Sequence, residues 1–296
     1  MNDLKAKMTF KKILVPVIGA KQDAISLSAA FAAAKPFSAH VEALFVHPDP
    51  REAVPYVGMP VSPEVIQQIV DSTEEIAKAA SKAARAALDA AAKDAGAKIA
   101  EHPLSVKDFV TCHYREVRGH FITRVAQAAR LADVVVFGPA TLDSGPDVSG
   151  AFIDTLAHIR RPVLLSPRQP VHNLTNRIVI GFDGGLAAAH ALSAALPYLA
   201  IADDVEILAV QQAPLDIKSL DEAVEYLALH GISAKPRIVD RGALSAGEAL
   251  LDAATRSGAS MLVIGGYGHS RLMETMLGGT TVHLTSHLAL PLFMVH

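Results

Sequence analysis

The segment from Met261 to His296, MLVIGGYGHSRLMETMLGGTTVHLTSHLALPLFMVH, carries the pattern that decides the fold. Its first four residues form an apolar run bounded by glycine, which is typical of a buried strand. Gly265 and Gly268 follow at once, and Gly278-Gly279-Thr280-Thr281 comes nine residues later, where a helix is expected to begin. Glycine lets the backbone approach a ligand closely, and a helix N-terminus offers free N–H groups. The segment therefore predicts an anion pocket that favours phosphate; the alternative is two ordinary turns around a surface loop.

The strands of this segment and of the part of the chain before it recur, with altered sequence, in the first half of the chain. DVVVFG at 133–138 matches SMLVIG at 260–265, ILVPVIG at 13–19 matches IVIGFDG at 178–184, and VEALFV at 41–46 matches VEILAV at 205–210. The offset between matching residues of the two copies is 165 at their first strands and 127 at their fourth strands, so the first copy holds about 38 extra residues between these strands. We therefore expect two similar domains, residues 1–168 with a helical insertion and residues 174–296 with an intact loop.

Strand and helix patterns alternate along both copies. This alternation predicts an α/β fold with two repeated, doubly wound parallel sheets of five strands each. The expected strands are 13–17, 41–46, 98–106, 134–137 and 163–165, then 178–182, 205–210, 235–240, 261–264 and 290–295. The expected helices are 22–34, 64–95, 119–131 and 150–158, then 186–199, 220–230, 245–257 and 280–287. Ser62 and Pro63 suit the start of the longest helix, and Gly96 suits its end.

Composition narrows the class of protein. The chain has 296 residues, is 51% hydrophobic and carries a formal net charge of −3, which argues against a nucleic-acid binder that relies on a basic face. No apolar run reaches the roughly 18 residues that a membrane span needs. The single cysteine, Cys112, cannot form an internal disulfide. These features predict a cytoplasmic protein without membrane or nucleic-acid partners.

A carboxylate is expected beside the glycine segment. Asp183 ends the first strand of the second copy and Gly265 ends its fourth strand, so both fall on the rim formed by the carboxyl ends of parallel strands. A carboxylate next to a phosphate loop suggests a nucleotide, in which Asp183 accepts a hydrogen bond from base or ribose. The alternative is that Asp183 only forms a turn.

At this point the chain resembles the universal stress protein family. The features that carry the resemblance are Gly265-x2-Gly268-x9-Gly278 with nearby threonines, an early strand ending in Asp183, and the closing strand LPLFMVH. Both copies share it, so the chain is similar to tandem members with two such domains. The resemblance implies a universal stress protein or adenine nucleotide alpha hydrolase-like fold, in which the last strands of two domains pair.

The resemblance also implies the binding residues of the family's ATP-binding branch. Carried over by position, they are Asp183, Val210, Ile264, Gly265, Gly268, Gly278, Gly279, Thr280 and Thr281. The sequence departs from the pattern at Gly279, where the family usually has serine or threonine. A backbone N–H remains there but a hydroxyl is lost, and Thr280 is the candidate to replace it.

The first copy departs much further. Ile18 occupies the position of Asp183, and Gly138 is followed by Pro139, which lacks an N–H donor. Asp143 and Asp147 add negative charge where phosphate would lie. We therefore expect this half to be a structural partner that does not hold nucleotide in the usual way.

Histidines raise the alternative of a metal site. Cys112-His113 with His120 forms a half-site without a second cysteine, and His283 and His287 lie four residues apart without the HExxH pattern. No catalytic arrangement stands out, so the chain is not expected to be an enzyme beyond slow ATP hydrolysis.

The leading hypothesis is a tandem universal stress protein that binds an adenine nucleotide, ATP with or without Mg²⁺, in its C-terminal half and acts as a stress-response sensor or regulator. The expected assembly is an intramolecular pseudo-dimer of the two copies, with a homodimer as a further option. The alternatives are an interaction scaffold without a cofactor and a weak ATPase.

Overall fold

A computed structural model describes residues 9–50, 62–104, 106–139, 146–211, 217–266 and 288–296. The first half contains β1 (Lys12–Val17), α2 (Asp23–Ala34), η1 (Lys35–Phe37), β2 (His40–His47), α3 (Pro63–Ala95), β3 (Lys98–Ile99), β4 (Thr111–Arg118), α4 (Phe121–Ala129), β5 (Val134–Phe137), α5 (Val148–Ala157) and β6 (Val163–Leu165). The second half contains β7 (Arg177–Gly181), α6 (Leu186–Leu199), β8 (Asp204–Val210), α7 (Ile217–Leu229), β9 (Ala234–Val239), α8 (Ala246–Arg256), β10 (Met261–Gly265) and β11 (Leu292–Val295).

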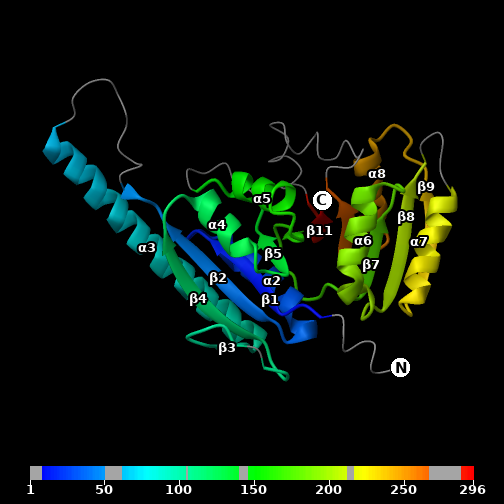
Figure 1. The fold of residues 1–296 in the computed structure, drawn as a ribbon, viewed down its shortest axis with the longest axis horizontal. Coiled ribbons are helices and arrows are strands. Elements are labelled where there is room, and N and C mark those ends of the chain that lie inside the picture. Colours follow the sequence, from blue (N-terminus) through cyan, green and yellow to red (C-terminus); the bar gives the residue numbers. More distant parts are fainter. Residues whose placement is uncertain (1–8, 51–61, 105, 140–145, 212–216, 267–287) are drawn as a thin grey trace.

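The described strands form one sheet in the order β3-β4-β2-β1-β5-β6-β11-β10-β7-β8-β9 (Figure 1). Neighbouring strands are parallel within each half, and only β6 and β11 pair antiparallel, with Phe293 opposite Leu164. Outward from this pair the strand order is the same in both halves, apart from the two-residue edge strand β3. The predicted pairing of the last strands is therefore observed. The domain boundaries stay a prediction, because a single sheet continues across them.

Helices cover both faces of the sheet. One apolar cluster joins the strands to α2, α3, α6 and α7, and a second joins them to α4, α5 and α8. Along β5, Val134 and Val136 face the first cluster while Val135 and Phe137 face the second. Strand residues alternate between two buried faces, which explains why the strands read as continuous apolar runs. The doubly wound arrangement is confirmed.

The two halves also meet between α2 and α6. Tyr198 of α6 is fully buried, and its hydroxyl donates a hydrogen bond of 3.1 Å to the carbonyl oxygen of Ala33 in α2. Its ring packs against Phe10, Phe37 and Phe293, with centroid separations of 5.1, 5.2 and 5.9 Å. Aromatic contacts from both halves therefore reinforce the β6–β11 pairing at this seam.

The predicted third strand of the first half was only partly right. Among the described residues of the expected range 98–106, a strand is formed by Lys98 and Ile99 alone, at the edge of the sheet. The partner of β2 is β4, paired with it from Thr111 opposite His40 to Arg118 opposite His47. The sequence TCHYREVR lacks an apolar run because its buried end is polar. Its buried polar side chains are satisfied by partners on β2, which no local pattern reveals.

The ends of α3 follow the sequence signals. Ser62 Oγ accepts a hydrogen bond from the Val65 N–H, Pro63 occupies the first turn, and Gly96 ends the helix at φ 66°. The expected helix 280–287 lies outside the described residues. None of the helices within the described ranges combines the length and apolar character required to cross a membrane.

Candidate functional site

The carboxyl ends of β10, β7 and β8 lie side by side in the sheet, and four of the predicted binding residues stand there. Val210 ends β8 and Gly265 ends β10, while Asp183 lies two residues beyond the end of β7. The register pairs Gly181 with Leu208, which brings Asp183 level with Val210 across the neighbouring strand. The structure therefore brings Asp183, Val210, Ile264 and Gly265 to one rim.

Asp183 is exposed at the entrance to α6. Its Oδ1 accepts a hydrogen bond of 2.9 Å from the N–H of Gly185, the residue that precedes the helix. Gly184 adopts φ +78°, and its Cα faces Ser219 of α7, whose Oγ would lie 2.8 Å from an added Cβ. The aspartate therefore forms the turn that the alternative interpretation expects. This turn leaves Oδ2 without a described protein partner and available to a ligand.

Ile264 and Gly265 have structural roles as well. Ile264 is 4% exposed and its side chain lies in the second apolar cluster, so mainly the backbone of this residue is present at the rim. A Cβ on Gly265 would lie 2.5 Å from the carbonyl carbon of Ala187 in the first turn of α6. Glycine at this position therefore allows the N-terminus of α6 to lie directly against the end of β10.

The remaining predicted binding residues, Gly268, Gly278, Gly279, Thr280 and Thr281, lie outside the described residues. Their roles stay predictions. The described chain reaches Gly266, whose N–H donates a 2.6 Å hydrogen bond to the carbonyl oxygen of Val295, and resumes at Leu288. The glycine segment thus leaves the sheet at the same rim on which Asp183 stands.

The equivalent loop of the first half is filled by the protein itself. The Asp23 carboxylate accepts hydrogen bonds from the N–H groups of Ile18, at 3.1 Å, and Gly19, at 2.7 Å. Asp23 is 2% exposed, and burial raises its pKa to about 6 against the opposing effect of these backbone donors. The backbone donors that follow β1 are therefore bound to an internal anion.

The helix α3 closes the same loop from outside. Gly19 adopts φ +80°, and a Cβ there would lie 2.4 Å from the carbonyl oxygen of Ala80 in α3. Ser81 and Tyr114 share a 3.1 Å hydrogen bond that holds α3 on β4. Asp147, expected to repel phosphate, caps α5 by accepting a 2.7 Å bond from the Gly150 N–H. Within the described residues, the rim of the first half is thus occupied by protein.

The Cys112-His113-His120 half-site does not exist as a cluster. Cys112 belongs to the first apolar cluster, and burial raises the pKa of its thiol to about 11. Adjacent residues of a strand point to opposite faces, so His113 points to the other side, where it contacts His40. The described residues contain no group of three side chains suited to a metal ion. His283 and His287 lie outside these residues.

A buried polar network on β1, β2 and β4 was not predicted. His40 Nε2 lies 2.6 Å from His113 Nδ1, and His40 Nδ1 lies 2.7 Å from Thr111 Oγ1. Glu42, whose side chain is 2% exposed, forms ion pairs with Lys12 at 2.8 Å and with Arg115 at 3.1 Å. Burial raises the pKa of Glu42, but the two cations and His113 outweigh it and the net pKa is lowered. The spacing HxE on β2 was the only sequence signal for this network.

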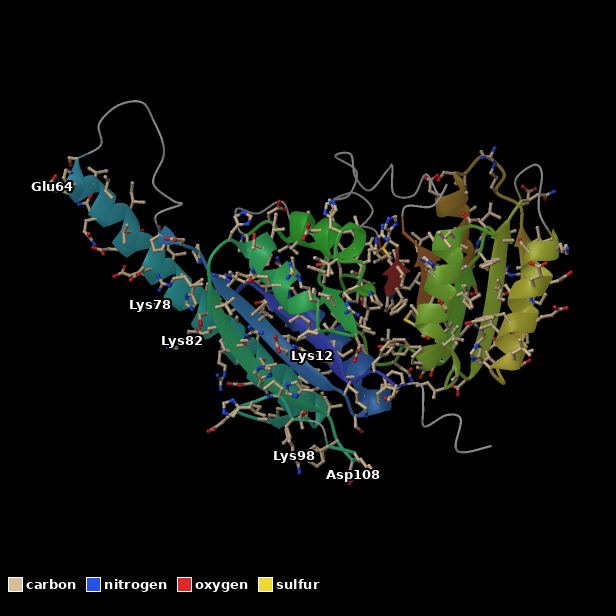
Figure 2. All side chains as sticks on the ribbon, viewed as in Figure 1. Lys12, Glu64, Lys78, Lys82, Lys98 and Asp108 are labelled. Carbon is tan, nitrogen blue, oxygen red and sulfur yellow. The ribbon has the colours of Figure 1, made fainter. Side chains whose placement is uncertain are left out.

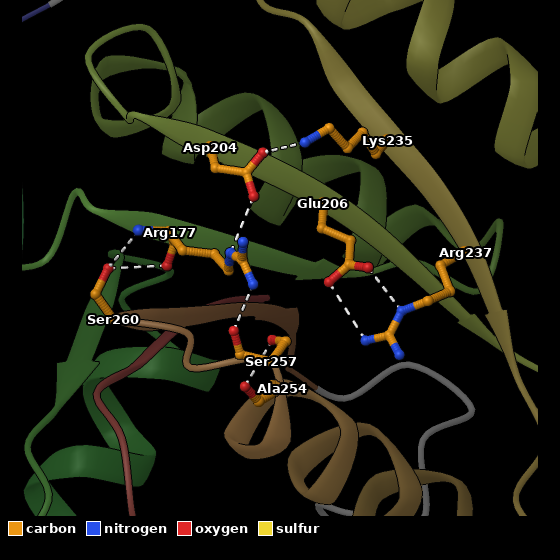
Figure 3. Close-up of polar contacts among 8 residues, drawn as sticks. All are labelled: Arg177, Asp204, Glu206, Lys235, Arg237, Ala254, Ser257 and Ser260. Atoms are coloured by element: carbon orange, nitrogen blue, oxygen red, sulfur yellow. Dashed lines mark hydrogen bonds and ion pairs between the residues drawn. The ribbon is translucent and has the colours of Figure 1, made fainter.

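The second half has a polar network at the corresponding place (Figure 3). Asp204 pairs with Arg177 and Lys235, both at 2.9 Å, and Glu206 pairs with Arg237 at 2.6 Å. Arg177 also donates a 2.5 Å hydrogen bond to the carbonyl oxygen of Ser257, which ties β7 to the end of α8. Both networks lie at the amino ends of the strands, opposite the rim that carries Asp183. The two networks stabilise the pairing of neighbouring strands and do not belong to the candidate site.

Comparisons with known proteins identify the fold. No protein-family model and no curated protein matches the chain. Among solved structures, a universal stress protein from Archaeoglobus fulgidus DSM 4304 superimposes with a TM-score of 0.62 and 16% identity over 97% of both chains. A protein of unknown function from Pseudomonas aeruginosa PAO1 gives a TM-score of 0.52 and 12% identity over 100% of this chain and 94% of the other. The chain therefore has the universal stress protein fold along its whole length, as the resemblance implied.

Proposed function

We propose that this protein binds one adenine nucleotide per chain, ATP in the first instance, at the carboxyl ends of β7, β8 and β10, and that it acts in the cytoplasm as a stress-response sensor or regulator. The observation that carries the proposal is the difference between the two equivalent loops. In the first half, Asp23 and α3 fill the loop after β1. In the second half, Asp183 stands exposed on the rim from which the glycine segment departs.

In this proposal each part of the site has a separate task. Asp183 accepts a hydrogen bond from the adenine amine or a ribose hydroxyl, and Val210 supplies apolar contact beside it. The backbone N–H groups of the glycine segment bind the phosphates, because such segments carry several donors and no side chains that block approach. Mg²⁺, where present, would screen phosphate charge. The first half contributes the paired strand β6 and the packing around Tyr198.

The regulatory role includes slow ATP turnover at most. Efficient phosphoryl transfer requires a positioned base and carboxylates that hold Mg²⁺, and the sequence offers neither pattern beside its glycine segment. A nucleotide that binds without rapid hydrolysis changes the stability of the folded state. By mass action this amounts to about 2.7 kcal/mol at a hundredfold excess over Kd.

The test begins with mass spectrometry of ligand released from the purified protein, followed by calorimetric titration with ATP, ADP and AMP. We expect one site per chain. Two equivalent sites would contradict the inactive first half, and no binding of any adenine nucleotide would favour the scaffold. Gly268→Val is expected to abolish binding, since a branched side chain would resist positive φ and fill the phosphate space.

Asp183→Asn separates the proposed ligand contact from the turn, because an amide oxygen can still accept the bond from Gly185. We expect Asp183→Asn and Asp183→Ala both to weaken binding. Asp240→Ala is the matched control, since Asp240 is also exposed and makes the same turn with Gly242 at 3.0 Å. Equal effects of Asp183→Ala and Asp240→Ala would show that only the turn matters.

A further inference from the structure

The helix α3 projects well beyond the body of the protein (Figure 1). Its 33 residues correspond to about 50 Å of helix. The C-terminal part packs on α2, β2 and β4 and buries Ala77, Ser81, Ala84, Leu88 and Ala92, whereas the turns that precede Ala77 have no buried side chain. Figure 2 shows Glu64 at the outer tip, with Lys78 and Lys82 closer to the body.

A second, exposed stripe runs along the face of this helix that lies nearly opposite the buried one. Its members follow the alternating spacing of four and three residues that defines the contact positions of a two-stranded coiled coil. They are Val65, Ile69, Ser72, Ile76, Ala79, Ala83, Ala86 and Ala90, of which Ile69 is half-buried and the others are exposed. Ile76 is 68% exposed and Val65 is 44% exposed, although both are apolar. No described part of the chain covers this stripe.

We propose that the stripe binds the same stripe of a second copy of this chain, with the two α3 helices antiparallel. The stripe is bulky in its first half and consists of alanine in its second half. An antiparallel pair sets these halves against each other, so that Val65 lies opposite Ala90, Ile69 opposite Ala86 and Ile76 opposite Ala79 of the other copy. Each large side chain then meets a small one, which gives an even separation between the helices.

Charges beside the stripe favour the same arrangement. Glu75 and Lys82 occupy equivalent positions on one side of it, both are exposed, and neither forms an ion pair within the described residues. In the antiparallel pair, Glu75 of each copy lies beside Lys82 of the other, which forms two interchain attractions at once. A parallel pair would set isoleucine against isoleucine, alanine against alanine, and Glu75 beside Ala80, without a partner charge.

The C-terminal part of α3 is packed on the body and the projecting turns continue the same helix, so association has little of it to order. The stripe is narrow and half alanine, so the contact area is modest. We therefore expect a reversible dimer with a Kd on the order of micromolar, and its two bodies at opposite ends of the paired helices.

Charge reversal in the full-length protein tests the arrangement by sedimentation equilibrium. Glu75→Lys alone and Lys82→Glu alone each replace two attractions by two repulsions, and each is expected to weaken the dimer by about tenfold. The double variant restores the attractions and should return Kd to within about threefold of the original. Both sites are exposed, so melting temperatures of the monomers should stay unchanged. The proposal is overturned if the protein is a monomer at all concentrations, or if the single charge reversals leave the Kd of the dimer unchanged.

Disulfide trapping tests the direction of the helices. Val65→Cys combined with Ala90→Cys is expected to cross-link two copies, whereas Val65→Cys alone is not, because its counterparts lie about 37 Å apart in the antiparallel pair. The native Cys112 is buried and does not compete. Equal cross-linking by Val65→Cys alone would indicate parallel helices and would overturn the antiparallel pairing.

Discussion

Acidification is expected to destabilise the protein through the buried His40–His113 pair. Burial, and then the neighbouring His113, lower the pKa of His40 from 6.5 to about 4. Burial likewise lowers the pKa of His113. A histidine with a depressed pKa binds its proton more readily in the unfolded chain, so its contribution to stability is present above pH 6.5 and is lost as the pH falls toward 4. The groups around the pair are Lys12, Glu42, Thr111, Arg115 and His102.

The magnitude follows from the pKa of His40 in the two states. A depression from 6.5 to about 4 corresponds to about 3 kcal/mol when fully expressed. About 2 kcal/mol of this is lost between pH 7 and pH 4.5, because the unfolded form is protonated over most of that interval. His40 is 3% exposed, so solvent does not screen the effect substantially.

Urea unfolding of the wild type and His40→Gln from pH 7 to pH 4.5 measures this contribution. The carboxylates titrate in both proteins, so the difference between their pH profiles reports His40 together with its coupling to His113. At pH 7 we expect His40→Gln to be less stable by about 1–3 kcal/mol, because its hydrogen bonds are altered. The gap should then narrow by about 2 kcal/mol toward pH 4.5. His190→Gln, at an exposed position, gives the baseline for replacing a histidine. Parallel profiles for the wild type and His40→Gln would refute the reasoning.

Four further predictions address the fold and the proposed function. Gly19→Ala should lower the free energy of unfolding by about 2 kcal/mol or more, because it combines positive φ with a clash against α3. Gly96→Ala, also at positive φ but with open space around it, should lower it by about 1 kcal/mol. Equal losses in chemical unfolding would contradict the contact with α3. Tyr198→Phe should lose about 1 kcal/mol of unfolding free energy with its hydrogen bond to α2, and an unchanged stability would show that this bond is not needed. Truncation after Leu288 should expose the edge of β6 and cause aggregation, so a well-behaved monomer would refute the role of β11. Phosphate release should remain below about 1 s⁻¹, the low end for ordinary enzymes, and faster turnover would overturn the regulatory proposal.

The sequence by itself determined the order and type of nearly all described elements. The bounds of α6, β5 and β6 agree with their predicted ranges, and α3 begins after Ser62 and ends before Gly96 as its capping residues indicate. These features depend on local signals: apolar runs, helix propensity, caps and glycine at positive φ. The repeated alternation of strands and helices in the two halves also predicted the fold class. It placed Asp183 and Gly265 on one rim, because the carboxyl ends of parallel strands meet at one edge of the sheet.

Tertiary structure alone decided which parts of the sequence are buried against expectation. β4 was missed because His113 and Thr111 are polar, and only their pairing with His40 across the sheet makes their burial favourable. The sequence also did not predict that Asp23 fills the loop after β1. In the sequence Asp23 resembles an ordinary residue at a helix start, and only the structure shows its carboxylate accepting hydrogen bonds from Ile18 and Gly19. Such contacts join residues through the folded sheet. Their free energy depends on whether each buried polar group finds a partner, and a linear pattern does not contain that information.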